Sequence, residues 1–158
     1  MNKFFKTIFF ILFVFITQAE SKILSIGSSN AKVTVKVFSS LTCPHCANFH
    51  TEIFNKLKKD YIDIGLVKFE HHAFPLDLAA LNAEVLVRCQ TNNEKKFKLL
   101  EEIYNKQKIW AVGSDINKIK DLIKKIGARF DLTEDMMNSC LADSNAQDEI
   151  LNQRIEAQ

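Results

Sequence analysis

The strongest constraint on the fold of this chain is a change of sequence period at a pair of cysteines. In AKVTVKVFSS, residues 31–40, valines alternate with polar residues, which predicts a strand with one buried face. The segment LTCPHC follows at once, and after it the spacing of apolar residues becomes helical, at Cys46, Phe49, Ile53 and Leu57. The sequence therefore predicts a buried strand that leads through Cys43 into a helix whose inward stripe begins at Cys46.

The position of this CPHC motif predicts its chemistry. The first backbone N–H groups of a helix are unpaired and its dipole is positive there, so a thiolate is favoured over a thiol. Cysteines placed in this way can have pKa values of about 3.5–7.5. Pro44 suits the first helical turn, and His45 adds a donor or a positive charge beside Cys43. We expect Cys43 to be the exposed, reactive sulfur and Cys46 to resolve the mixed disulfide.

The N-terminal segment MNKFFKTIFFILFVFITQAESK has the pattern of a secretory signal peptide. Lys3 and Lys6 precede an apolar run that is too short to span a membrane, and small residues then favour cleavage before Glu20. We therefore expect a mature chain that is exported to the periplasm and is not membrane-embedded. Without Lys3 and Lys6 the chain has 19 basic and 19 acidic residues and no basic block, so nucleic acid is not an expected partner.

Two other uses of the CPHC cysteines are less favoured. A structural zinc site needs four ligands, but Cys89 and Cys140 lie far apart on separate predicted helices. His71 and His72 end a predicted strand, where we expect them to be exposed to solvent. A purely structural bond between Cys43 and Cys46 would close a loop too small to gain much entropy. We predict no metal and no cofactor.

Cys89 and Cys140 each end an apolar stripe, so they could be buried, inert thiols. In an oxidising compartment a remaining even pair more often forms a bond. We favour a structural disulfide that joins two helices of the second half of the chain.

The remaining pattern predicts one domain in about 140 residues. A second strand is expected within residues 65–72, and from Pro75 onward the pattern is helical. We expect one helix to start at Ser114 and to end at Gly127 as a C-cap. Thr133 should cap a shorter helix, and Ser144 should open the last one.

Three segments give the chain a resemblance to a known family. They are SIGSSNAKVTVKVFSSLTCPHCANFH, HHAFPLDLAALNAEVLVRC and SCLADSNAQDEILNQRIEAQ. With these segments the chain resembles the DsbA family of thiol–disulfide oxidoreductases, particularly its alphaproteobacterial members. The resemblance implies an α/β, thioredoxin-like fold with an inserted helical domain. The expected parts are a signal peptide (1–19), the first part of the thioredoxin-like domain (20–75), the helical insertion (76–142) and the start of a return helix (143–158).

The resemblance also implies an activity. Cys43 and Cys46 would donate disulfides to reduced exported proteins, with His45 tuning the pair from its place beside Pro44 in the motif. A DsbB-type, quinone-linked membrane oxidase would reoxidise it. The segment Phe74-Pro75 matches a structural part of the family, and we expect Trp110 to be a core residue.

The chain departs from the family at its C-terminal end. In the family the return helix leads into a strand preceded by a cis-proline that faces the cysteines, and neither Pro44 nor Pro75 can serve as that proline. We expect a truncated member with impaired activity, whose sheet contains only the strands near Val35 and Val67. Two alternatives remain, a disulfide isomerase or reductase of the same fold and a non-catalytic remnant or binding module.

Overall fold

The structure, a computed structural model, describes residues 23–157, so the predicted signal peptide lies outside the described residues. Its sheet consists of β1 (Leu24–Ile26), β2 (Val33–Ser39) and β3 (Val67–Ala73), in the order β1-β3-β2. The strand β2 runs parallel to β3, and β1 runs antiparallel to it. Both predicted strands are confirmed. The expected two-stranded sheet was wrong, because β1 is too short to show a sequence period and is defined by its pairing with β3.

The central strand β3 and the edge strand β2 differ in burial. Side chains of β3 alternate between buried and half-buried positions along the whole strand. In β2 the alternation is present, but Val35 and Val37 are only partly buried against the core and Val33 is 52% exposed. The predicted buried face of β2 is therefore confirmed only toward its carboxyl end, which leads to the cysteines.

The helix after the cysteines contains π-helical turns. It consists of α1 (Pro44–Asn48), the π-helical segment η1 (Phe49–Phe54), α2 (Asn55–Leu57) and the π-helical segment η2 (Lys58–Ile62). A π turn contains more residues than an α turn, so the inward stripe shifts along the sequence. Phe54 is fully buried and Ile53 is 54% exposed, which corrects the prediction that Ile53 faces the core.

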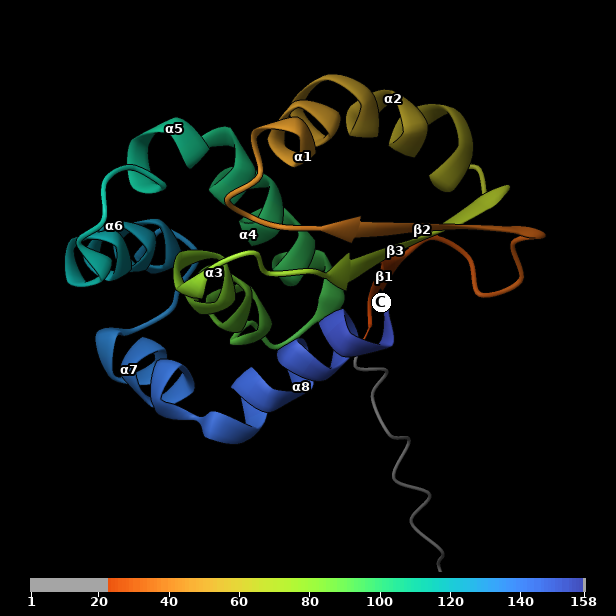
Figure 1. Ribbon diagram of the computed structural model, residues 1–158. Coiled ribbons are helices and arrows are strands. Elements are labelled where there is room, and N and C mark those ends of the chain that lie inside the picture. The colour runs from red at the N-terminus through yellow and green to blue at the C-terminus, as the bar shows by residue number, and fades with distance from the viewer. Residues whose placement is uncertain (1–22, 158) are drawn as a thin grey trace, which may run out of the picture.

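Six more helices follow β3. They are α3 (Leu78–Arg88), α4 (Asn93–Asn105), α5 (Gln107–Trp110), α6 (Ile116–Ala128), α7 (Glu134–Ala142) and α8 (Ser144–Glu156). In Figure 1 the helix that begins with α1 lies above the sheet, and α8 lies below it. The helices α3 to α7 extend to the side of the sheet where β2 ends. Trp110 is fully buried and its Nε1 donates to the Ile103 carbonyl at 2.8 Å, so its predicted place in the core is confirmed.

Side-chain caps define most of these helix starts. The capping residues are Asp77, Asn92, Asp115, Thr133 and Asp143. The predicted cap at Thr133 is confirmed. The predicted opening of the last helix at Ser144 is confirmed, since Ser144 is the first residue of α8, but Asp143 and not Ser144 accepts the free N–H groups there. The start predicted at Ser114 was wrong, because α6 begins at Ile116 and Asp115 accepts its free N–H groups.

Gly127 is not the C-cap that the sequence predicts. It lies inside α6, where a Cβ atom would come within 2.8 Å of the Met137 sulfur and 3.1 Å of the Leu86 side chain. The left-handed conformation after α6 is adopted by Asp131, at a φ of 64°. The glycine therefore serves the close packing of α6 against α3 and α7.

No helix between residues 23 and 157 has the length and apolar character that a membrane span requires.

Candidate active site

The two cysteines of the motif lie where β2 passes into α1. Cys43 is the N-cap residue of α1, and Pro44 is its first residue. Both cysteines are free thiols and both are half-buried, but Cys46 packs against the hydrophobic core. The position of the pair follows from the local sequence, since the strand period ends at Ser39 and proline is favoured in a first helical turn.

The environment of Cys43 favours its thiolate. Burial by itself would raise its pKa, but hydrogen bonds from the Cys46 backbone, the Cys46 thiol and the His45 backbone lower the pKa below the usual value of 9.0. The His45 side chain is exposed, so the contact that it makes with this sulfur comes from its main chain. At neutral pH, Cys43 is the more readily ionised thiol of the pair.

The environment of Cys46 favours its thiol. Burial is the largest influence and raises the pKa above 9.0, and the nearby Cys43 raises it further. The Ser39 hydroxyl and the Ser40 backbone hydrogen-bond the Cys46 sulfur and lower the pKa in part. Two cysteines separated by one turn of helix therefore have opposite pKa shifts.

The helices α3 to α7, which we call the helical part, hold the loop that carries Cys43. Gln107 of α5 donates through Nε2 to the carbonyls of Leu41 and Cys43, at 2.8 and 3.0 Å. The Thr42 hydroxyl donates to Asp77 at 2.8 Å, and the same carboxylate caps α3. No local pattern in the sequence predicts the roles of Gln107 and Asp77, because these contacts join residues 64 and 35 positions apart.

A cluster of buried polar side chains lies behind Cys46. The hydroxyl groups of Ser39 and Tyr104 are 2.6 Å apart, and the Tyr104 ring stacks on His50 at 4.3 Å. His71 and Glu84, both fully buried, are joined at 2.6 Å. No motif in the sequence points to this cluster, whose members come from β2, η1, β3, α3 and α4.

The predicted exposure of His71 was wrong. The period of β3 places His71 on its buried face, where Glu84 of α3 provides a partner. His72 lies on the other face, is half-buried and contacts Glu70 at 3.0 Å. Among the residues that the structure describes, no group of three or more His, Cys, Asp or Glu side chains is arranged to hold a metal ion.

The second pair of cysteines forms a disulfide. Cys89, at the C-terminal end of α3, is bonded to Cys140 of α7, and their Cα atoms are 6.1 Å apart. This bond joins two helices of the helical part, whereas Cys43 and Cys46 lie at the start of α1, at the end of the sheet.

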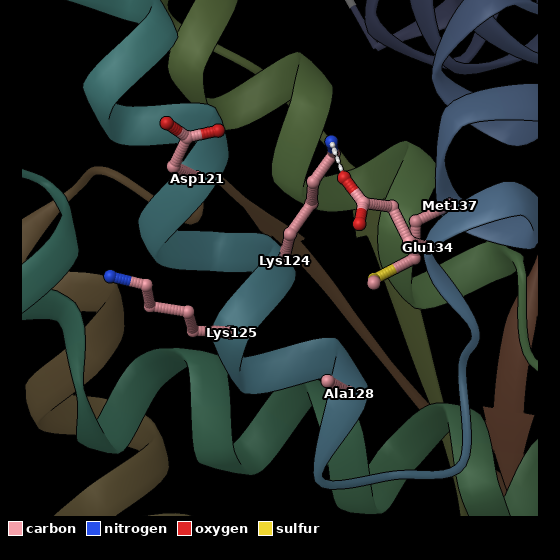
Figure 2. A pocket seen from close by; sticks show the side chains of 6 residues that line it. All are labelled: Asp121, Lys124, Lys125, Ala128, Glu134 and Met137. Carbon is pink, nitrogen blue, oxygen red and sulfur yellow. Dashed lines mark ion pairs between the residues drawn. The ribbon is translucent and has the colours of Figure 1, made fainter.

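Two hollows on the molecule differ in their distance from the cysteine motif: one adjoins it and the other lies between two later helices. A groove of about 520 Å³ adjoins the motif, since Thr42 lines it together with Asp77, Leu78 and the start of α6. A second hollow of about 340 Å³ lies between α6 and α7, and Figure 2 shows its charged lining. There Lys124 points to Glu134, at 3.7 Å, and no thiol or histidine is among its lining residues. Of these two hollows, the first is therefore the one next to the motif.

Comparisons with known proteins agree with this geometry. Residues 19–158 match the family model described as Thioredoxin. The chain is 34% identical over 119 residues to a "Putative protein-disulfide oxidoreductase" of Rickettsia bellii, and the match covers 75% of this chain and 44% of that protein. It is 30% identical over 140 residues to Disulfide bond formation protein D of Bacillus subtilis, covering 84% of this chain and 63% of that protein.

A solved structure has a similar fold. The crystal structure of alpha-DsbA1 from Wolbachia pipientis matches with a TM-score of 0.80 and 30% sequence identity, covering 87% of this chain and 68% of that one. The chain thus spans less than half the length of the first of these relatives and about two thirds of the second.

Proposed function

Since the chain belongs to the DsbA-like thiol–disulfide oxidoreductases, which have the thioredoxin fold, we propose that it transfers disulfides to exported proteins through Cys43 and Cys46. The observation that carries the proposal is the place of two free thiols at the start of α1, with Cys43 as the N-cap residue and Cys46 packed against the core. The pKa is lowered at the first and raised at the second, in agreement with these places. In a pair of this kind Cys43 is a good leaving group because it is stable as a thiolate, and Cys46 stays protonated in the reduced pair.

The transfer has two steps. A substrate thiolate attacks the Cys43 sulfur of the oxidised pair, so a bond between Cys43 and the substrate forms, the Cys43–Cys46 bond breaks, and Cys46 leaves as a thiolate that takes up a proton. A second substrate thiolate then attacks the substrate's own sulfur in the mixed disulfide, and Cys43 leaves as a thiolate. The substrate loses two electrons, which the reduced pair keeps until an acceptor removes them.

The direction of transfer depends on the stability of the reduced pair. The hydrogen bonds from the Cys46 and His45 backbones to the Cys43 sulfur stabilise its thiolate and so the reduced form. A stabilised reduced form makes the disulfide a stronger oxidant. These contacts support disulfide donation over reduction or isomerisation.

The substrates and the reoxidant follow from this direction. Reduced proteins outside the cytoplasm are the substrates that an oxidising pair would serve, because disulfides persist there. A DsbB-type, quinone-linked membrane oxidase would take the two electrons. We place the protein in the periplasm for the same reason.

The reduction potential of the Cys43–Cys46 pair tests the proposal. Equilibration with glutathione buffers should give a value closer to the about −120 mV of a strong oxidant than to the about −270 mV of a reductant. A potential near the lower value would favour the reductase alternative. Failure to oxidise a model dithiol peptide at any pH, in a folded chain, would favour the non-catalytic alternative.

Single cysteine variants assign the two roles. Cys43→Ser should abolish dithiol oxidation, whereas Cys46→Ser should accumulate mixed disulfides, because the resolving sulfur is absent. Mass spectrometry of the trapped adducts identifies the bonded residue. Adducts on Cys46 in the Cys43→Ser variant, formed as fast as those on Cys43 in the reciprocal variant, would contradict the assignment.

His45→Ala tests the tuning role of the histidine separately. The variant keeps the backbone contact to Cys43, so a change measures the imidazole alone. We expect the alkylation pKa of Cys43 to rise and the pair to become less oxidising, because a nearby positive charge favours a thiolate. If neither quantity changes, His45 acts through its backbone only.

A further inference from the structure

The Cys46 sulfur has a hydroxyl partner that is itself held in place. Ser39, the last residue of β2, is 1% exposed, and a hydrogen bond from its hydroxyl is the largest influence that lowers the pKa of Cys46 against the effect of burial. A serine has one hydrogen to donate, so its effect on a sulfur depends on where that hydrogen points. The second contact of the Ser39 hydroxyl therefore decides whether its hydrogen points to the Cys46 sulfur.

That second contact is the Tyr104 hydroxyl of α4, 2.6 Å from the Ser39 oxygen. Tyr104 is 2% exposed. Burial, followed by the charge of Glu84, raises the pKa of its phenol well above the usual value of 10. The phenol keeps its proton at any physiological pH and is a permanent donor. If Tyr104 donates to Ser39, the Ser39 hydrogen is left for Cys46.

The Tyr104 ring is fixed by a neighbour of Cys46. His50 lies four residues after Cys46 and stacks on Tyr104 with an interplanar angle of 15°. His50 is 3% exposed, so neither ring can turn away into solvent. The hydroxyl of Tyr104 is therefore held against β2 from the side of η1.

We propose that Ser39 is a catalytic residue for the Cys46 sulfur and that Tyr104 is the positioning residue that orients it. Tyr104 donates to the Ser39 oxygen, and Ser39 donates to Cys46 when that sulfur carries negative charge. This role rests on the proposed disulfide transfer through Cys43 and Cys46.

The charge on Cys46 arises in the first step of transfer. As a substrate thiolate bonds to Cys43, the Cys43–Cys46 bond breaks and its electron pair moves to the Cys46 sulfur. The hydrogen bond from Ser39 then strengthens, because bonds to charged acceptors are the stronger ones. Neither hydroxyl loses its proton, and the Cys46 thiolate is protonated from water after the step. In the reverse direction the same contact stabilises Cys46 as the attacking thiolate.

Several titratable groups belong to the motif or to the polar cluster around Tyr104 and must be held constant in the test. They are Cys43 before α1, His45 of α1, His50 of η1, His71 of β3, Glu84 of α3 and Tyr104 of α4. The substitutions at Ser39 and Tyr104 change none of these charges, since the Tyr104 phenol is neutral, and Cys43→Ser is common to all the variants whose Cys46 pKa is compared.

The test measures Cys46 directly in the full-length chain. In a Cys43→Ser background, Cys46 is the single free thiol of the described residues, because Cys89 and Cys140 are bonded. Its alkylation rate as a function of pH gives its pKa. Tyr104→Phe and Ser39→Ala should each raise that pKa by about one unit. The double variant should equal Ser39→Ala alone, because Tyr104 acts through Ser39.

A second measurement follows the reaction itself. With both cysteines present, reduction of the oxidised pair by a small thiol should be roughly 3- to 10-fold slower in Tyr104→Phe than in wild type. The matched control is Tyr61→Phe, which loses the same atom at a residue that is 48% exposed. Its rate should be that of wild type.

The outcomes separate the possible failures. If Tyr104→Phe lowers the melting temperature but changes neither the Cys46 pKa nor the reduction rate, the hydroxyl pair is only a packing contact and the inference is wrong. If Ser39→Ala does not fold, the Tyr104→Phe result decides alone. If the Cys46 pKa shifts as expected while the wild type oxidises no dithiol peptide, the inference holds and the proposed function fails.

Discussion

His50 has an environment that does not suit an ionisable side chain. It is 3% exposed, and among the described residues neither ring nitrogen has a hydrogen-bond partner. Its ring packs against aromatic neighbours on three elements, namely Phe54, Phe69 and Tyr104. Burial, followed by the charge of His71, lowers its pKa from the usual value of 6.5 to about 3. The folded protein therefore keeps His50 neutral.

This gives a stability that depends on pH. Below pH 6.5 His50 becomes protonated in the unfolded chain, whereas in the folded chain it stays neutral until the pH falls to about 3. Stability should therefore be lost as pH falls through this window, with a contribution of up to about 1.4 kcal/mol per pH unit. Urea unfolding of wild type and His50→Phe at pH 7, 6 and 5 measures it. The variant should show the shallower decline, and equal slopes would show that His50 is protonated when folded.

At the scale of elements, the disulfide between α3 and α7 joins helices that belong to the same helical part as α5. Cys89 and Cys140 are 51 positions apart in the sequence, so their bond closes a long loop. Cross-linking such a loop restricts the unfolded chain and stabilises the fold by up to about 4 kcal/mol in the chain-entropy model.

Removal of this bond should affect stability and not the active cysteines. We expect Cys89→Ala with Cys140→Ala to lower the free energy of unfolding by about 2–4 kcal/mol in a denaturant titration. The reduction potential of Cys43 and Cys46 should remain that of wild type, because their contacts come from α1, β2 and α5. A large shift of that potential would mean that the bond between α3 and α7 also shapes the motif.

At the scale of the whole molecule, a buried pair of polar side chains joins the sheet to the helical part. His71 of β3 and Glu84 of α3 are 2.6 Å apart and both fully buried. Arg88 lies 3.8 Å from the same carboxylate and donates to Gln153 of α8, whose side chain also accepts from the Ala73 backbone at 3.3 Å. The sheet, α3 and α8 are thus connected through one polar network.

Glu84→Gln should destabilise the whole molecule by roughly 3–5 kcal/mol, because it removes the buried carboxylate that both His71 and Arg88 contact. Burial alone would raise the pKa of Glu84, but the charge and hydrogen bond of His71 and the charge of Arg88 lower it below 4.5. Its contribution is therefore complete above pH 4.5 and is lost as pH falls through its folded pKa. Chemical unfolding at pH 7 and pH 4 measures both effects.

The matched control for this prediction is Glu94→Gln. Glu94 forms an exposed pair with Lys98 one turn along α4, and solvent screens such pairs. Its substitution should change stability far less than Glu84→Gln. Equal effects of the two variants would show that the buried pair does not hold the sheet and helices together.

Much of the site could be predicted because its determinants are local. The valine alternation of β2, the switch to helical spacing after Cys46 and the proline in the first turn of α1 act over a few residues. These determine a thiol pair at a strand–helix junction whatever the rest of the chain does. The cap at Thr133 is local in the same way.

The tertiary structure alone decided what lies behind that pair. Tyr104 reaches Ser39 across 65 positions and Gln107 reaches Cys43 across 64, so no sequence window contains both partners. His71 is buried rather than exposed because β3 is the central strand and α3 supplies Glu84. Such contacts depend on how whole elements pack against one another. The same packing buries Cys46 and His50, and this burial shifts the pKa of each away from the usual value of its residue type.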